Sequence, residues 1–206
     1  MKRVMGYIDG FNLFFGMRDS GLRRYYWLDP EALIQNLLKP GQQLAGVRYF
    51  SARISPSASD PDKHLRQQAY LEAVETLAEV ETIYGHYLSK PKTCLRCGFD
   101  WQQNEEKMTD VNIAVRLLAD AMDDAFDTAM IVSADSDLVP PVMEVRARFP
   151  EKRIIIANPP KRHSVRLAEA ANICFTIGRK KLQDSQLSDQ ITKPDGFVLT
   201  RPASWK

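Results

Sequence analysis

Short β-rich apolar runs alternate along this chain with longer amphipathic stretches. The apolar runs predict strands at residues 3–9, 44–52, 80–88, 128–134, 152–158 and 172–177. Between them, apolar residues at helical spacing predict helices at 29–38, 60–78, 109–122, 138–149 and 164–171. Such alternation is typical of a parallel sheet with helices on both faces. The predicted fold class is therefore α/β, with a central, mostly parallel sheet flanked by helices.

Local signals mark the starts of several of these helices. Asp29 is expected to cap the helix at 29–38, with Pro30 at its first helical position, and Asp60 with Pro61 repeats this signal at 60–78. The prolines of the helix at 138–149 are confined to its first turn. In the helix at 109–122, several apolar residues lie near one face, as an amphipathic helix requires: Val111, Val115, Leu118 and Met122.

Length and composition indicate one sizeable core. The chain has 206 residues, is 44% hydrophobic and carries a formal net charge of +2, so charge alone does not indicate a nucleic-acid partner. Apolar stretches are shorter than the ~18 residues of a membrane helix, and the N-terminal run is too short for a signal peptide, so a cytoplasmic protein is expected. One domain is predicted at 1–181, with an insertion at about 90–104, followed by a polar tail at 182–206 that docks through Phe197 and Trp205.

Acidic residues stand where predicted strands end. Asp9 ends the first strand, Asp135 and Asp137 follow the strand at 128–134, and Asp110 opens the helix at 109–122. Taken alone, each is most simply a helix cap or turn residue. Asp137 can cap the helix that begins at Leu138, whereas Asp135 cannot easily cap the same helix. Ligands of open parallel sheets bind at the carboxyl ends of the strands, so these carboxylates are candidates for a shared site.

Converging carboxylates need a positive partner. Two like charges about 4 Å apart repel by roughly 4 kcal/mol at an effective dielectric of 20. Lys107 is a local cation, but a divalent metal offsets more charge. Carboxylate and water ligands favour Mg²⁺ or Mn²⁺, and these motifs contain no histidine that would favour zinc.

Three ordered motifs resemble a known family. The stretches YIDGFNLFFG, EEKMTDVNIAVRLL and IVSADSDLVPPV are similar to those of NYN domains, in the LabA-like group of the PIN-like nuclease superfamily. The resemblance covers about residues 3–178. It implies a PIN-like three-layer α/β fold and an acidic, metal-dependent site that hydrolyses RNA. Met108 departs from the family pattern, which commonly has a glycine there.

The resemblance assigns roles to individual residues. Asp9, Asp110 and Asp135 are expected to be the principal ligands of Mg²⁺ or Mn²⁺, and Asp137 a further ligand or a water-positioning group. Asn12 and Ser133 are expected to orient a ligand, the substrate or a water, and a helix cap is the alternative for Asn12. The expected activity is that of a metal-dependent ribonuclease.

Basic residues near the same edge are candidates for binding RNA. Lys107 precedes Asp110, and PPKRHSVR places three cations after the strand at 152–158: Lys161, Arg162 and Arg166. An ordinary solvated charge run is the alternative. Arg23 and Arg24 adjoin three aromatic residues, a combination that suits single-stranded or structured RNA, with a buried aromatic cluster as the alternative.

Cys94 and Cys97 form a C-x-x-C-G turn within an irregular excursion at 90–107. Three interpretations stay open: a reduced hairpin knuckle, a zinc site completed by His86 and another group or by a second chain, and a redox switch. Tetrahedral zinc needs four ligands, and this pair supplies two. A homo-oligomer is compatible with the second interpretation.

Other functions remain as alternatives to a ribonuclease. The first is an RNA-binding or regulatory module that keeps the fold with little or no catalysis. The second is a phosphohydrolase of small substrates, which is disfavoured because the first motif reads D-G-F-N and lacks the second acid of a D-x-D motif.

Overall fold

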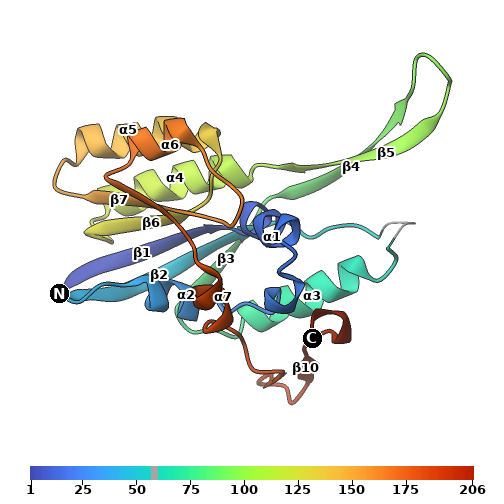
Figure 1. The fold of residues 1–206 in the computed structure, drawn as a ribbon, viewed down its shortest axis with the longest axis horizontal. Helices are drawn as coiled ribbons and strands as arrows, with labels where there is room; N and C mark the ends of the chain where they lie inside the picture. Colours follow the sequence, from blue (N-terminus) through green and yellow to red (C-terminus); the bar gives the residue numbers. More distant parts are fainter. Residues whose placement is uncertain (57–59) are drawn as a thin grey trace.

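A six-stranded parallel sheet forms the centre of the computed structural model, which describes residues 1–56 and 60–206 (Figure 1). The sheet order is β3-β2-β1-β6-β7-β8, and each neighbouring pair is parallel. The strands are β1 (Lys2–Asp9), β2 (Gln42–Ser51), β3 (Val80–Tyr84), β6 (Thr128–Val132), β7 (Arg153–Asn158) and β8 (Ile173–Thr176). The predicted α/β class is confirmed. Because the sheet grows outward from β1 in both directions, its topological switch point lies between β1 and β6.

Helices cover both faces of the sheet and complete three layers (Figure 1). One face carries α4 (Thr109–Met122), α5 (Val139–Arg148) and α6 (Val165–Ala170). The other carries α1 (Gly10–Asp19), α2 (Pro30–Leu37), α3 (Lys63–Val74) and α7 (Arg179–Gln183). Alternate residues of β1 serve the two cores: Val4 and Ile8 face the second group, and Met5 and Tyr7 face the first.

The buried face of α4 differs from the predicted one. Val111, Val115 and Met122 are 60%, 62% and 71% exposed, whereas Ile113 and Leu117 are fully buried. The cause is Asp120, which points inward because its carboxylate accepts a 2.9 Å hydrogen bond from the Tyr7 hydroxyl and forms an ion pair with Arg48. Because the charged residue Asp120 lies on the buried face of α4, the apolar pattern of the sequence indicated a different face. The list of buried α4 residues is Thr109, Ile113, Leu117, Asp120 and Ala121.

Other elements also depart from prediction. Asp29 caps α2 as expected, but α3 begins only at Lys63, with Asp62 rather than Asp60 at its N-cap position. The expected strand at 80–88 ends at Tyr84, and a new strand begins at His86. The expected irregular excursion is instead an antiparallel hairpin that projects from the body (Figure 1), formed by β4 (His86–Thr93) and β5 (Asp100–Lys107).

The C-terminal segment packs against the body. It contains β9 (Gln190–Thr192), β10 (Val198–Thr200) and the short 3₁₀ helix η3 (Ala203–Trp205). Leu182, Leu187, Leu199 and Trp205 join the core on the α1–α3 side. Of the two aromatic residues expected to dock this segment, Trp205 is buried, but Phe197 is 60% exposed, so the expectation for Phe197 is wrong. Within the described residues, none of the helices has the length and apolar character needed to cross a membrane.

Candidate functional site

Asp9 lies at the switch point of the sheet, where β1 ends and α1 begins. Its side chain is 4% exposed and caps α1 by accepting a 2.9 Å hydrogen bond from the backbone N–H of Asn12. The other carboxylate oxygen accepts a 3.1 Å bond from the Ser133 hydroxyl. The helix-cap alternative is therefore confirmed for Asp9 and is wrong for Asn12. Hydrogen bonds from α1 and from Ser133 after β6 hold the Asp9 carboxylate in its orientation.

The charges of Asp110 and Asp135 act on the Asp9 carboxylate at the end of β1. Burial and, to a smaller extent, the negative charges of Asp110 and Asp135 raise the pKa of Asp9 to about 7, against the lowering effect of the hydrogen bonds from Asn12 and Ser133. The sequence positions of these acids span more than 120 residues, so the meeting depends on β1 and β6 being neighbours. The arrangement concentrates negative charge around a poorly solvated carboxylate.

The loop after β6 holds its acids by local hydrogen bonds. The backbone N–H of Asp135 donates to the Ser133 hydroxyl over 3.1 Å, and that of Ala134 donates to the Asn12 side chain over 3.2 Å. Asp135 is also the cap of the 3₁₀ turn η2 (Ser136–Leu138), because its carboxylate accepts from the N–H of Asp137. The expectation that Asp137 rather than Asp135 caps this region is therefore wrong. Asp137 itself is exposed.

Asp110 enters the site from the first turn of α4, where the helix dipole favours a carboxylate. The residue before this helix, Met108, has a φ of 77°, in the left-handed region that side chains other than glycine rarely adopt. The backbone at 108 thus requires the conformation for which a glycine is suited. Lys107 is exposed at the end of β5, opposite His86 in the hairpin ladder.

The donor set fits a hard dication. Asp9, Asp110 and Asp135 offer carboxylate oxygens, and Ser133 and Asn12 add neutral oxygens, which are the ligands that Mg²⁺ and Mn²⁺ prefer. As the side chains stand, no three acidic, histidine or cysteine groups among the described residues are gathered closely enough to hold a metal ion. Oxygens of both Asp9 and Asp135 are instead engaged in the bonds described above.

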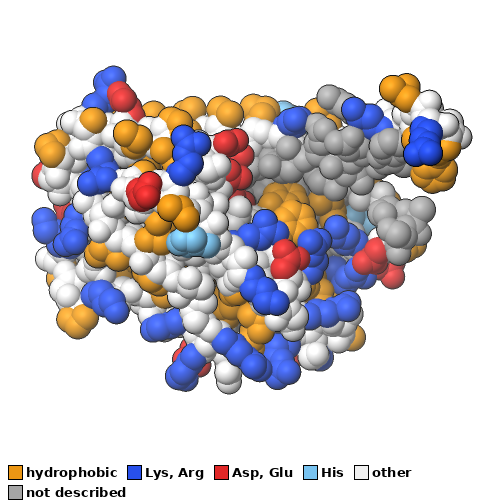
Figure 2. Space-filling view, turned by 45° about the horizontal axis from the view of Figure 1, so that its top comes forward, with side chains coloured by type: hydrophobic (Ala, Val, Ile, Leu, Met, Phe, Trp, Pro, Cys, Tyr) orange, Lys and Arg blue, Asp and Glu red, His pale blue; other side chains and the backbone are white. Residues whose placement is uncertain are grey.

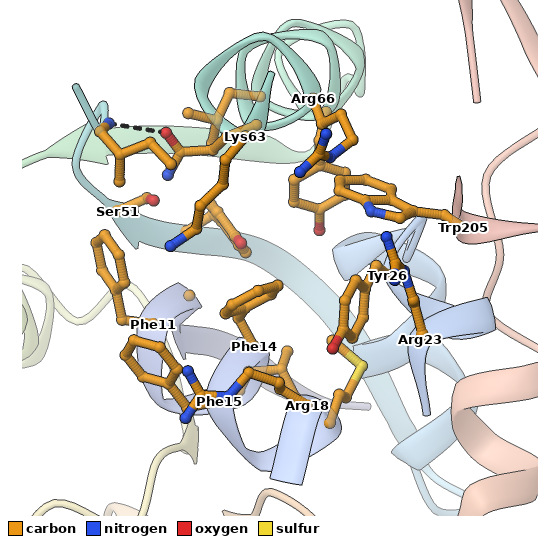
Figure 3. Close-up of a pocket in the computed structure, with 18 of the residues that line it drawn as sticks. Phe11, Phe14, Phe15, Arg18, Arg23, Tyr26, Ser51, Lys63, Arg66 and Trp205 are labelled. Atoms are coloured by element: carbon orange, nitrogen blue, oxygen red, sulfur yellow. Dashed lines mark hydrogen bonds between the residues drawn. The ribbon is translucent and has the colours of Figure 1, made fainter. Parts of the chain in front are cut away.

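A cavity of about 600 Å³ opens beside the acids, between α1, α3 and the C-terminal η3. Figure 3 shows its lining: Phe11, Phe14 and Phe15 come from α1, Lys63 and Arg66 from α3, and Tyr26 and Trp205 close one end. Figure 2 shows a hollow with hydrophobic side chains inside it and blue Lys and Arg side chains along its rim. Rings and cations therefore occupy the side of the site that faces away from α4.

The basic residues expected to bind RNA lie at separate places in the structure. Arg23 lines the cavity, and Arg24 is exposed beside it. Lys161 and Arg162 are held against the end of α1, since Lys161 donates to the carbonyl of Asp19 and Arg162 pairs with its carboxylate over 2.8 Å. The structure thus gives this pair a structural partner. A further residue of the set is exposed on α6: Arg166.

The aromatic residues after Arg24 are interior ones. Tyr25, Tyr26 and Trp27 are buried, and the Trp27 indole donates a 2.8 Å hydrogen bond to the carbonyl of Ser188. The alternative of a buried cluster therefore holds for Trp27. Tyr26 belongs to both descriptions, because it is buried and also lines the cavity.

Cys94 and Cys97 lie at the tip of the β4–β5 hairpin as free thiols. His86 lies at the base of the same hairpin, opposite Lys107, whereas Thr93 pairs with Asp100 at the tip. Eight residues of extended strand correspond to roughly 26 Å. A zinc site that joins this pair to His86 of the same chain is therefore contradicted by the geometry.

Several cavity residues were missed by the sequence analysis, some because α1 was not predicted and others because no local signal turned the predicted helix at 60–78 toward the site. Phe11, Phe14, Phe15 and Arg18 all lie on that helix, and Lys63 and Arg66 lie on α3. The available signal was Asp9 as a cap, followed by apolar residues at helical spacing from Phe11 to Met17. No local signal indicated that Trp205 would reach the same place.

Fold and site together define an α/β domain with acidic residues at the switch point of its parallel sheet. The family model for the NYN domain matches residues 3–178, and the chain belongs to that family. The α/β architecture is consistent with a PIN-like NYN domain.

Individual relatives are more distant. The chain is 29% identical to 6-hydroxy-3-succinoylpyridine 3-monooxygenase HspA from Pseudomonas putida (strain DSM 28022 / S16), in a match that covers 70% of this chain and 56% of that protein. The chain thus matches little more than half the length of this relative. A crystal structure of a protein of unknown function from Vibrio parahaemolyticus RIMD 2210633 superposes with a TM-score of 0.56 at 17% identity, covering 90% of this chain and 96% of that one. That likeness concerns the fold alone.

Proposed function

We propose that this protein is a metal-dependent ribonuclease of the LabA-like group, which hydrolyses phosphodiester bonds in RNA. The observation that carries the proposal is that Asp9 is buried at the switch point within electrostatic reach of Asp110 and Asp135; burial, together with these two charges, raises the pKa of Asp9 to about 7. A protein that crowds carboxylates around a buried one gains stability when a cation joins them. Membership of the NYN family supplies the nuclease-like context.

The chain's own residues prepare the site. Asp9, Asp110 and Asp135 would hold Mg²⁺ or Mn²⁺, which when bound acidifies a water and neutralises charge on the phosphate. Hydrogen bonds of Ser133 and Asn12 hold Asp9 and the loop after β6 in place. Asp137, which is exposed, would be a further ligand or orient a water for attack on the phosphorus. Above about pH 7, Asp9 is ionised and able to act as a ligand.

Cleavage of RNA tests the proposal. Wild-type protein is incubated with single-stranded and structured RNA in Mn²⁺, beside Asp135→Asn and the matched control Asp123→Asn. Asp123 is an exposed carboxylate at the opposite end of α4 from Asp110. We expect metal-dependent cleavage by wild type and Asp123→Asn, and a loss of about 100-fold or more in Asp135→Asn. Equal, metal-independent cleavage by all of them would refute the proposal.

An RNA-binding or regulatory module is a second candidate. It is favoured by the finding that, in the described part of the chain, no metal-ready cluster of ligands is gathered in advance. In that case RNA binds in Mn²⁺ and remains intact, and Asp135→Asn changes neither result.

A small-molecule function is a third candidate, favoured by the cavity and by the name of the relative from Pseudomonas putida. An aromatic acid such as a succinoylpyridine combines a planar ring with a carboxylate, and the cavity combines rings with cations. Binding of aromatic acids without binding of RNA would favour this candidate.

A further inference from the structure

The cavity beside Asp9 is built largely of aromatic rings. The ring centroids of Phe14 and Tyr26 are 4.8 Å apart, and those of Tyr26 and Trp205 are 5.7 Å apart. Tyr70 continues the cluster, 6.2 Å from Trp205. A wall of this kind offers faces and edges on which a flat, unsaturated ring packs favourably.

The same cavity has an excess of positive charge. Its lining contains Arg18, Arg23, Lys63 and Arg66, against one acid, Asp60. Arg66 pairs with Asp60, and the charge of the same carboxylate also interacts with Lys63 and Arg23. In Figure 3, the Lys63 side chain reaches from α3 into the middle of the cavity. One carboxylate cannot neutralise four cations, so the cavity offers an excess of positive charge to an anionic group.

The cavity adjoins the acidic centre through two residues. Gly10 lines it and directly follows Asp9, and a Cβ at this position would lie 2.7 Å from both the Tyr49 hydroxyl and the Phe50 carbonyl. Tyr49 lines the cavity as well, and the charge of Asp9 adds to the burial that raises the pKa of Tyr49. A ligand in the cavity therefore contacts Gly10, the residue that directly follows Asp9.

We propose that this cavity binds a planar aromatic ring that carries an anionic group, in the form of one nucleotide unit of an RNA strand. Its base packs among Phe11, Phe14 and Tyr26, and a phosphate next to it meets Lys63 and Arg23. The inference rests on the proposed function, for which it names the subsite beside the scissile phosphate. A free aromatic carboxylate shares the required chemistry and is tested as a separate ligand.

Calorimetric titration with the metal removed by EDTA tests the cavity without reference to cleavage. The ligands are adenosine 5′-monophosphate, adenosine, ribose 5-phosphate and nicotinate. We expect the nucleotide to bind at least about tenfold more tightly than adenosine or ribose 5-phosphate, because ring and anion contribute together. If the nucleotide binds no better than either fragment, the proposal is overturned.

Variants locate the binding. Lys63→Glu removes a cation, and Phe11→Ala removes a ring; each is expected to weaken nucleotide binding about tenfold or more. The matched control is Lys39→Glu, an exposed lysine just before β2 and thus at the opposite edge of the sheet. Equal affinity of Lys63→Glu and Lys39→Glu would place the nucleotide elsewhere and overturn the proposal.

The outcomes separate this inference from the proposed function. Nucleotide binding that is lost in Lys63→Glu, together with an absence of RNA cleavage, upholds the cavity and refutes the nuclease. RNA cleavage that is unaffected by Lys63→Glu upholds the nuclease and refutes the cavity as its subsite. Tight binding of nicotinate with none of the nucleotide overturns the assignment to RNA and identifies a small aromatic acid as the ligand.

Discussion

The hydroxyl of Ser133 lies between Asp9 and Asp135 and bonds to both. It donates to the carboxylate of Asp9 over 3.1 Å and accepts from the backbone N–H of Asp135 over the same distance. Ser133 is fully buried, so neither bond is replaced by bulk water. One hydroxyl thus couples the end of β1 to the loop after β6.

Replacing this hydroxyl should destabilise the protein and perturb Asp9. In Ser133→Ala, a buried carboxylate loses a donor and an N–H loses its acceptor, at a cost of about 1–3 kcal/mol in the free energy of unfolding. The pKa of Asp9 should rise further, because the bond that lowers it is gone. Urea denaturation at pH 8 measures the first effect, and NMR titration the second. Ser136→Ala, at an exposed serine in the same loop, is the control; similar losses in both would contradict this role.

Asp9 should make stability fall as pH rises. Its pKa of about 7 in the folded protein lies above the ordinary value of 3.8, so the folded state retains a proton that the unfolded state releases. The free energy of unfolding therefore decreases between about pH 4 and pH 7, by on the order of 4 kcal/mol from this group. Asp9→Asn removes the ionisation, so it should be the more stable form at pH 8 in EDTA and should lose this dependence. Urea denaturation of both proteins at pH 5 and pH 8 measures the effect. If the stability of wild type and of Asp9→Asn changes equally between the two pH values, the prediction is contradicted.

Glycine at position 108 should stabilise the chain. Met108 has a φ of 77°, so Met108→Gly relieves about 1 kcal/mol of backbone strain. Because Met108 is 49% exposed, the packing that is lost with its side chain is limited. Met143→Gly provides the contrast, because Met143 is an exposed residue inside α5, where glycine costs about 1 kcal/mol. Thermal unfolding should therefore shift upward for the first variant and downward for the second. A downward shift for both would show that strain at 108 is negligible.

The hairpin tip should bind zinc between two chains. The N–H groups of Arg96 and Cys97 lower the pKa of the Cys94 thiol, which favours the thiolate that zinc needs. One tip supplies two of four ligands, so we expect about 0.5 zinc per chain and a dimer that dissociates in chelator. Leu95 and Phe99 are exposed there and would meet in such a dimer.

Metal analysis with size-exclusion chromatography checks this expectation. Cys97→Ser should abolish both zinc and dimer, and Cys174→Ser, at a half-buried cysteine in β8, should retain them. Reduced thiols without zinc would indicate a simple knuckle, and a Cys94–Cys97 disulfide would indicate a redox pair.

Sequence patterns sufficed where local chemistry determines structure. The apolar runs around Ile8 and Ile131 could only be buried strands, and Asp29 followed by Pro30 fixed the start of α2. The proximity of Asp9 and Asp135 also followed from a general property of parallel sheets, once β1 and β6 were neighbours.

Tertiary interactions account for what the pattern did not predict. Asp120 of α4 lies in the core because Tyr7 of β1 and Arg48 of β2 donate hydrogen bonds to its carboxylate, and no local rule places an aspartate there. Gly16 reads as a helix breaker, yet it lets α1 approach the loop after β7, where a Cβ would lie 2.7 Å from Pro159. The cavity requires α1, α3 and Trp205 together, and their approach is a property of the whole fold.

Trp205 makes the shape of the cavity depend on a segment that returns from the far end of the chain. Its indole packs against Tyr26 and Tyr70, and β9 and β10 carry it there. Occupancy of the cavity and docking of this segment are therefore thermodynamically linked. A ligand that contacts the indole should slow hydrogen exchange in 190–206. The factor by which the ligand favours docking of the segment equals the factor by which docking raises the affinity for the ligand.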